Sequence, residues 1–285
     1  MENKLYICST PIGNLEDITL RVLNTLRECG AVYCEDTRNT IKLLNRYEIK
    51  KPLISCHEHN EAERAVEICR FVLDGNSAAY VSDAGMPGIS DPGARLIREC
   101  LATGTPFELL PGACAAACAY VMSGLGDGRF LFEGFLPRRK GERARVLEEL
   151  KALERSIVFY ESPHRAADTL RELFETFGER NAALVREITK LHEEAKRMPL
   201  SELAAFYAQT PPRGECVIVV EGACKSCACE DNAQESVEEA IRRLTGGGMS
   251  AKETAKELAK SRGLDRNTVY KTAVEIINNS DMYIE

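Results

Sequence analysis

The chain has 285 residues, of which 44% are hydrophobic and 28% are charged, a balance that is typical of a globular protein and excludes a disordered or fibrous one. The net charge of −7 does not favour nucleic-acid binding by the chain as a whole, so such a role depends on local basic patches. Twelve cysteines, most of them in apolar segments, indicate reduced thiols in a cytoplasmic protein rather than a secreted disulfide scaffold.

The sequence predicts neither a signal peptide nor a membrane span. Residues 1–4 lead directly into a strand-like stretch that is too short for the apolar core of a signal peptide. The uncharged stretch 109–126 is interrupted by Pro111 and Gly112 and is rich in small residues, which favours a turn and a short buried helix. We therefore expect no membrane contact.

Short apolar runs alternate with helical periods over the first 222 residues, which predicts an α/β fold. The expected strands are Leu5–Cys8, Ala31–Cys34, Leu53–Cys56, Ala78–Ser82, Phe107–Leu110, Phe130–Phe132, Ser156–Tyr160, Ala182–Val185 and Cys216–Val220. The expected helices are Ile18–Cys29, Thr37–Arg46, Glu61–Leu73, Pro92–Ala102, Ala113–Met122, Gly141–Leu153, His164–Phe177 and Leu200–Ala208. A glycine-rich boundary at residues 125–128 divides the region into two α/β lobes, residues 1–125 and 126–222.

The character of the sequence changes after Gly222. Residues 223–235 are acidic and lack apolar periodicity, as expected of a linker. Residues 236–285 are expected to form a small all-α domain, in which Ser250 and Glu253 make a capping box and Asp265 or Asn267 begins the last helix. The spacing is that of a helix-turn-helix, a shape that any small helical hairpin shares. The expected helices are Ser236–Leu244, Ala251–Ser261 and Arg266–Ile277.

Two loops rich in glycine and proline follow predicted strands, at the edge where α/β sheets usually bind ligands. Residues 9–17 are compatible with a ligand loop and equally with an ordinary strand-to-helix turn. Residues 82–93 contain three glycines and two prolines, which indicates that their backbone approaches a ligand closely. Because this loop matches neither the dinucleotide fingerprint nor a P-loop, we expect backbone amides that cradle a small polar ligand.

A series of short motifs along residues 4–222 resembles the bacterial small-subunit rRNA cytidine-2′-O-methyltransferases of the tetrapyrrole methylase superfamily. The motifs are Thr10–Asp17, Glu35–Arg38, His57–Glu61, Asp83–Gly93, Leu110–Ala113, Gly134–Pro137, Phe159–Arg165 and Arg186–Lys190. The resemblance implies two α/β lobes of tetrapyrrole methylase type with a helix-turn-helix-like C-terminal domain, S-adenosylmethionine bound between the lobes, and a homodimer. It also implies 2′-O-methylation of a cytidine in the decoding-centre region of 16S rRNA, within the small ribosomal subunit.

By position in these motifs, the resemblance implies a cofactor pocket that draws on both lobes. The residues are Pro11, Asp83, Ala84, Gly85, Gly88, Ala113, Cys114, Ala115, Tyr160, Thr189 and Gly214. The usual Gly-Asp-Pro of the superfamily is replaced by Asp-Ala-Gly-Met-Pro at residues 83–87, which argues against a tetrapyrrole substrate.

A ribose hydroxyl is a weak nucleophile, so its methylation requires a general base as well as alignment with the methyl donor. The candidate catalytic residues in the shared motifs are Asp36, His57, Glu58, Glu187 and Lys190, the lysine serving to balance charge. Each has a plainer alternative: Arg38 and Glu35 are spaced as a surface ion pair, and His57 is placed to end a strand. The sequence does not choose among them.

Basic residues gather in two segments. Five of them stand against one acidic residue within Arg138–Arg145, and six stand against three between Ser250 and Lys271. We expect both segments to bind RNA phosphates because the rest of the chain is acidic; a solvated helix start and a dimer-stabilising or protective cap are the alternatives. The candidate RNA-binding residues are Arg38, Arg138, Arg139, Lys140, Arg165, Lys256 and Arg266.

Three further interpretations were weighed against this one. Cys224, Cys227 and Cys229 suggest zinc, but neither a second cysteine pair nor a histidine follows, so we expect no metal. A methylase of the same superfamily could act on a tetrapyrrole or another compact substrate, and a nucleic-acid-binding module could use the pocket as a sensor. A buried small substrate needs neither the basic segment nor the helical domain, which favours the rRNA enzyme.

Overall fold

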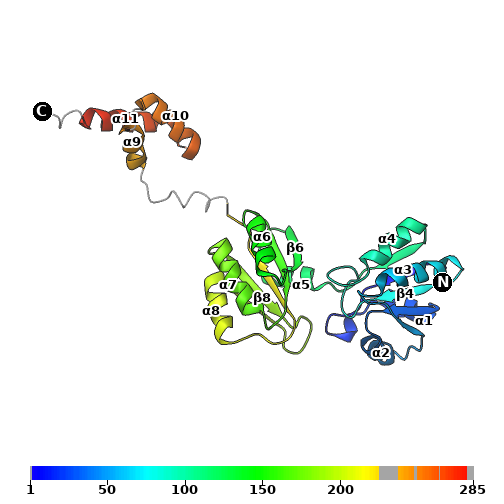
Figure 1. The fold of residues 1–285 in the computed structure, drawn as a ribbon. Helices are drawn as coiled ribbons and strands as arrows, with labels where there is room; N and C mark the ends of the chain where they lie inside the picture. Colours follow the sequence, from blue (N-terminus) through cyan, green and yellow to red (C-terminus); the bar gives the residue numbers. More distant parts are fainter. Residues whose placement is uncertain (1, 225–236, 247–248, 263, 281–285) are drawn as a thin grey trace. The chain divides into compact units, whose positions relative to one another are not determined.

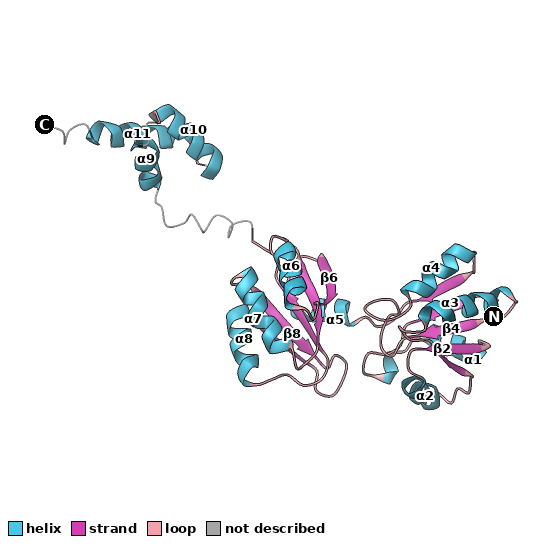
Figure 2. Cartoon of the chain, viewed as in Figure 1, coloured by secondary structure: helices cyan, strands magenta, loops and turns pink. Residues whose placement is uncertain are grey.

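The computed structural model describes residues 2–224, 237–246, 249–262 and 264–280 (Figure 1). The chain divides into two compact units between Ala223 and Cys224. The first unit holds two α/β lobes and the second is helical (Figure 2). Most of the predicted linker, residues 225–235, lies outside the described residues, as do Cys227 and Cys229.

The first lobe is built on a parallel sheet with the strand order β3-β2-β4-β1-β5. Its strands are β1 (Leu5–Cys8), β2 (Ala31–Cys34), β3 (Leu53–Ser55), β4 (Ala78–Val81) and β5 (Phe107–Leu110). β1, β2 and β4 are buried throughout, which explains why their sequences are continuous apolar runs rather than alternating ones. Because β1 lies between β4 and β5, the loops that leave the carboxyl ends of these three strands meet at one edge.

Helices cover both faces of this sheet. α3 (Glu61–Leu73) and α4 (Ala94–Thr103) pack on one face, and α1 (Leu20–Glu28) and α2 (Thr37–Arg46) pack on the other. Ile68 and Leu96 are fully buried in the first cluster, and Leu26 is fully buried in the second. Each such side chain contributes about 1.5–3 kcal/mol, so the loops at the sheet edge leave a rigid base.

The second lobe is a mixed sheet with the order β6-β7-β10-β8-β9, in which β6 and β7 are parallel and the other pairs are antiparallel. Its strands are β6 (Phe130–Phe135), β7 (Ser156–Glu161), β8 (Asn181–Arg186), β9 (Glu194–Pro199) and β10 (Cys216–Val220). α6 (Lys140–Leu150), α7 (Ala166–Phe177) and α8 (Leu200–Gln209) pack on one face, and α5 (Ala115–Ser123) packs on the other through Ala116 and Ala119.

The second unit consists of α9 (Val237–Gly246), α10 (Ala251–Arg262) and α11 (Arg266–Ser280) around a small core that includes Ile241, Leu258 and Val269. The predicted capping box is confirmed: the Ser250 N–H donates to Glu253 Oε2 at 3.1 Å, and the Glu253 N–H donates to Ser250 Oγ at 3.4 Å. Lys256 and Arg266 are exposed on these helices.

The predicted fold class is confirmed, and the differences in detail have tertiary causes. β9 was not predicted, because its sequence Glu-Ala-Lys-Arg-Met-Pro shows no apolar alternation and it pairs as an edge strand with β8. α4 begins at Ala94 rather than Pro92, where the carboxylate of Glu61 on α3 accepts from the N–H groups of Gly93, Arg95 and Leu96 at 2.9, 2.9 and 3.2 Å. This cap comes from another helix, so the local sequence does not reveal it.

Candidate active site

A cavity of about 620 Å³ lies where loops of the first lobe meet the sheet of the second. The first lobe contributes the turn after β1, the glycine-rich loop after β4 and the turn after β5. The second lobe contributes the ends of β6 and β7, the turn after β8 and the start of β10. The volume is typical of sites for small molecules, about 300–1,000 Å³.

Backbone from two loops forms one wall of the cavity. The Thr10 N–H donates to Gly85 O at 2.9 Å, and the Gly85 N–H donates to Thr10 O at 3.0 Å, which joins the turn after β1 to the loop after β4. Gly85 has a φ of +79°, and a Cβ there would approach Ile12 Cγ2, on the same wall, at 3.2 Å. Glycine is required here because the chain turns through a left-handed conformation beside the cavity.

The opposite wall is aromatic and joins the two lobes. The Ala116 N–H at the start of α5 donates to the Tyr160 hydroxyl on β7 at 3.1 Å. Burial raises the pKa of this phenol, so Tyr160 is a neutral group in the wall. Phe132 and Phe135 of β6 contact its ring edge-on, with centroids 4.8 and 5.6 Å away. An apolar wall that contains aromatic rings suits a heterocyclic ligand.

A strained turn after β8 brings an ion-pair cluster into the wall. Glu187 and Thr189 have φ values of +52° and +64°, which non-glycine residues rarely adopt outside functional sites. Lys190 Nζ lies 3.1 Å from Glu187 Oε1 and 3.0 Å from Glu215 Oε2. Burial opposes ionisation of Glu187, but the hydrogen bonds from Lys190 and the Glu215 N–H lower its pKa overall. A Cβ on Gly214 would overlap the Glu187 carboxylate, so the glycine leaves room for the cluster.

Of the predicted catalytic residues, Glu187 and Lys190 line the cavity, whereas Asp36, His57 and Glu58 do not. Hydrogen bonds from the Arg38 side chain and N–H hold the pKa of the Asp36 carboxyl at about 2, in a pair exposed to solvent. Such a carboxylate is a weak base. His57 Nδ1 is buried and has no hydrogen-bond partner within the described part of the chain.

Some of the predicted cofactor-binding residues line the cavity and others do not. Six line the cavity: Ala84, Gly85, Cys114, Ala115, Tyr160 and Gly214. Five are not among the residues that line it: Pro11, Asp83, Gly88, Ala113 and Thr189. Two of the five support the wall. The Asp83 carboxylate accepts from the Asp36 N–H at 3.1 Å and from Asn39 Nδ2 at 2.9 Å, and the Thr189 hydroxyl donates to Asp17 of the other lobe at 2.5 Å.

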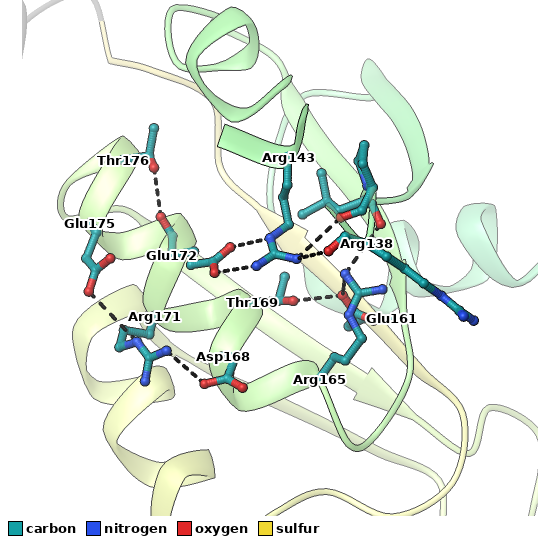
Figure 3. Close-up of polar contacts among 12 residues, drawn as sticks. Arg138, Arg143, Glu161, Arg165, Asp168, Thr169, Arg171, Glu172, Glu175 and Thr176 are labelled. Carbon is teal, nitrogen blue, oxygen red and sulfur yellow. Dashed lines mark hydrogen bonds and ion pairs between the residues drawn. The ribbon is translucent and has the colours of Figure 1, made fainter. Parts of the chain in front are cut away.

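The structure adds residues that the sequence reasoning did not select. Asp91 and Glu161 both line the cavity. Glu161 is buried, and its carboxylate accepts from the Thr169 hydroxyl at 2.7 Å (Figure 3). It also accepts from the Ser162 N–H at 2.8 Å. Asp91 belongs to the Asp83–Gly93 motif, in which the glycines are the predicted cofactor contacts. An acidic residue in a ligand-loop motif was the available signal.

Contacts from α6 and α7 hold the basic segment after β6 in place. Arg143 on α6 forms a bidentate ion pair with Glu172 on α7, at 2.5 and 2.6 Å, and donates to the carbonyls of Pro137 and Arg138 at 3.3 Å each (Figure 3). Arg143 therefore holds the loop in place rather than presenting a free charge. Arg138, Arg139 and Lys140 are exposed on that loop.

Arg165, a predicted RNA-binding residue, is also engaged within the lobe. Its guanidinium lies 3.5 Å from Glu161 Oε2 and donates to the Leu136 carbonyl at 3.3 Å (Figure 3). It thus links the buried carboxylate to the segment that follows β6. Arg38, by contrast, is 86% exposed and pairs with Asp36.

Two further predictions concern metals and membranes. Within the described residues, no group of three or more histidine, cysteine, aspartate or glutamate side chains is arranged to hold a metal ion. The cysteines that the structure describes form no disulfide with one another. Among the described helices, none has the length and apolar character needed to span a bilayer.

Solved structures share this two-lobed fold. The crystal structure of uroporphyrin-III C-methyltransferase from Thermus thermophilus, complexed with S-adenyl homocysteine, aligns with a TM-score of 0.56 at 17% identity, covering 76% of this chain and 97% of that one. A cobalt precorrin-4 methyltransferase aligns with a TM-score of 0.57 at 16% identity, covering 77% of this chain and 95% of that one.

Sequence comparisons establish the family. Ribosomal RNA small subunit methyltransferase I of Thermotoga maritima is 48% identical over 219 residues, which are 77% of this chain and 98% of that protein. The protein of the same name from Bacillus subtilis is 41% identical and covers 93% of this chain and 92% of its own length. Residues 4–204 match the tetrapyrrole (corrin/porphyrin) methylases. The resemblance seen in the motifs is confirmed: this chain belongs to the tetrapyrrole methylase family and is a methyltransferase.

Proposed function

We propose that this protein transfers the methyl group of S-adenosylmethionine to the ribose 2′-hydroxyl of a cytidine in 16S ribosomal RNA. The relatives named ribosomal RNA small subunit methyltransferase I support the class of substrate. The observation that carries the proposal is a cavity of about 620 Å³ whose β6 end leads directly into an exposed basic loop. In this proposal the cavity binds the small cationic cofactor, and the adjacent basic loop binds the polyanionic substrate.

The cavity wall fits S-adenosylmethionine. Gly85 offers a side-chain-free backbone surface, Tyr160 offers an aromatic edge, and Ile12 and Val217 keep the wall mainly apolar. These groups suit a ligand that combines a heterocycle with a short polar chain. When bound, the cofactor supplies a methyl group activated by a positively charged sulfur. The protein's own part is to align that methyl with the ribose and to exclude water.

The basic loop supplies the nucleic-acid contact in this proposal. Arg138, Arg139 and Lys140 follow Phe135, a cavity residue, within five positions. Arg139 pairs with Glu142 at 3.1 Å but remains 84% exposed, so its charge is accessible. Contacts to phosphate fix the position of an RNA strand without reading its sequence.

The substrate in this proposal is the small ribosomal subunit rather than free RNA. Basic residues lie in both compact units, on the loop after β6 and on α10 and α11, which favours a particle over a short strand. Such a substrate places the protein in the cytoplasm. We further propose that it acts as a homodimer, which light scattering of the purified chain tests directly.

The decisive experiment uses S-adenosylmethionine labelled in its methyl group. Isolated 30S subunits, protein-free 16S rRNA and a porphyrinogen are each incubated with the full chain, and the labelled nucleosides are identified after digestion. The expected product is 2′-O-methylcytidine, formed fastest in 30S subunits. Label in the porphyrinogen indicates a small-molecule methylase, and tight cofactor binding without any transfer indicates a sensor; both contradict the proposal.

A further inference from the structure

Asp91 lies on the cavity wall at the end where the two lobes meet. It follows Ser90, a non-glycine residue with a φ of +58°, and both residues line the cavity. The strained backbone turns Ser90 toward β6: a Cβ on Gly134 would lie 2.9 Å from Ser90 Oγ. Gly134 sits at a bulge in β6 and precedes Phe135, which also lines the cavity. Asp91 therefore follows directly after a residue that approaches the strand leading into the basic loop.

Residues other than Asp91 stabilise the loop after β4 and the start of α4. The buried carboxylate of Glu61 caps α4 by accepting from three N–H groups. The Gly88 N–H donates to Pro92 O at 3.1 Å, which closes the loop on itself around Asp91. Asp83 ties the other end of the loop to the turn after β2. A carboxyl at position 91 is thus placed in the cavity without serving as a helix cap.

The surroundings of Asp91 suit a proton acceptor. Burial, followed by the negative charges of Glu35 and Asp83, raises the pKa of its carboxyl to about 7, while a hydrogen bond with Ser82 opposes the shift. Tyr80 on β4 and Tyr160 on β7, both close enough to interact electrostatically with Asp91, remain neutral because burial raises the pKa values of their phenols. General bases work best when their pKa lies near the working pH. Within the cavity, Glu187 differs because its charge is already paired with Lys190.

We infer that Asp91 is the catalytic residue that accepts the proton of the ribose 2′-hydroxyl, an assignment that rests on the proposed function. The O2′–H bond breaks and its proton moves to the Asp91 carboxylate. The O2′ electron pair forms the new bond to the methyl carbon, and the bond between that carbon and sulfur breaks with its electron pair on sulfur. A carboxylate, a hydroxyl and a sulfonium become a carboxylic acid, a methyl ether and a neutral thioether, so charge and atoms balance.

The test compares the full-length wild type with Asp91→Asn, which keeps the shape of the side chain and removes its basicity. Asp74→Asn, an exposed carboxyl at the end of α3, is the matched control. Single-turnover methylation of 30S subunits is measured from pH 5.5 to 8.5, with cofactor affinity measured by calorimetry and subunit affinity by filter binding. We expect the wild-type rate to rise with pH through about 7 and Asp91→Asn to be slower by 100-fold or more, since general bases typically contribute 10²–10⁴-fold. Both affinities should stay within threefold, and Asp74→Asn should match the wild type.

A second readout does not depend on turnover. The ¹³C carboxyl signal that is missing from the spectrum of Asp91→Asn should titrate near pH 7 in the wild type; titration near 4 overturns the inference. An Asp91→Asn variant that methylates subunits at the wild-type rate overturns it, as does a loss confined to cofactor affinity, which would make Asp91 a binding group. A wild-type protein that transfers no methyl to RNA overturns the proposed function, and the inference with it.

Discussion

Gly85 and Gly88 offer a matched test of the cofactor cavity. Both lie in the loop after β4, with φ values of +79° and +84°. Alanine at either position must adopt the left-handed conformation, which costs roughly 1–2 kcal/mol of stability. Of the two, only Gly85 lines the cavity, and a Cβ there would press on Ile12 Cγ2 at 3.2 Å. The nearest atom to a Cβ on Gly88 is Ala94 N at 3.7 Å, an ordinary contact.

Gly85→Ala should therefore weaken S-adenosylmethionine binding about tenfold or more, equivalent to about 1.4 kcal/mol, while Gly88→Ala binds within twofold of the wild type. Both variants should lose similar stability, roughly 2–8 °C in Tm at about 2–4 °C per kcal/mol. Calorimetry of cofactor binding and thermal unfolding followed by circular dichroism measure the two quantities. Equal cofactor affinity in the two variants refutes the reasoning. If both bind normally, the cofactor does not use this wall, and if both bind poorly, the strain of the loop rather than the cavity is responsible.

Four other changes test different parts of the molecule. The folded-state pKa of Asp91 is raised, so the contribution of this group to stability is present below pH 4 and is lost as pH rises through about 7. Asp91→Asn should therefore be more stable than the wild type at pH 8 by about 1–2 kcal/mol, after discounting for partial exposure. This difference in stability, measured by urea titration, should vanish near pH 4. Arg143→Gln leaves Glu172 unpaired and should lower subunit affinity and stability without changing cofactor affinity. Replacing Arg138, Arg139 and Lys140 together by glutamine should reduce the slope of log affinity against log salt by about 2, at about 0.7 per phosphate contact. Truncation after Ala223 removes the basic residues on α10 and α11, so KM for 30S subunits should rise. We expect kcat to be retained, because 219 residues of this chain match 98% of the length of the Thermotoga maritima relative.

Each of these has an outcome that contradicts it. Equal stability of wild type and Asp91→Asn at pH 8 means that the aspartate is well solvated. An unchanged salt slope means that the basic loop faces solvent in the complex. A truncated protein with a much lower kcat shows that the helical unit acts in catalysis. A truncated protein with unchanged kcat and KM shows that the helical unit acts neither in catalysis nor in substrate binding. Normal subunit affinity in Arg143→Gln means that the loop needs no support from α7.

Local patterns were sufficient to predict the framework of the fold. The buried strands β1, β2 and β4 are continuous apolar runs, and parallel strands under two layers of helix require such runs. The capping box of Ser250 and Glu253 spans one helical turn, so its chemistry is complete within four residues. The family motifs include both glycine-rich loops that contribute to the cavity, whereas the residues that actually line it are seen only in the structure.

What could not be predicted depends on partners distant in sequence. Arg143 lies in a basic segment, and the sequence gives no sign that Glu172, 29 positions later, holds it. Arg165 stands in a family motif, and the Leu136 carbonyl that accepts from it lies 29 positions earlier. The raised pKa of Asp91 comes first from burial and then from the charge of Glu35, which lies 56 positions earlier and is brought near by the β2–β4 pairing. Glu61 begins α3 by its sequence position, yet its carboxylate caps α4. Ionisable residues are therefore where sequence reasoning about this site was weakest.

The net charge of −7 does not argue against an RNA substrate, because the positions of the charged side chains matter more than their sum. At physiological ionic strength the Debye length is about 8 Å, so an RNA phosphate responds to the side chains nearest to it rather than to the sum over the chain. Arg138 and Arg139 are exposed on the loop after β6 and Lys140 is exposed at the start of α6, whereas Asp91 lines the cavity and the Glu161 carboxylate is buried against Thr169 and Arg165. In the proposed function, the carboxylate of Asp91 attracts the cationic methyl donor and the exposed cations attract the polyanion. The two signs of charge then act on separate surfaces, so an acidic chain is compatible with both ligands.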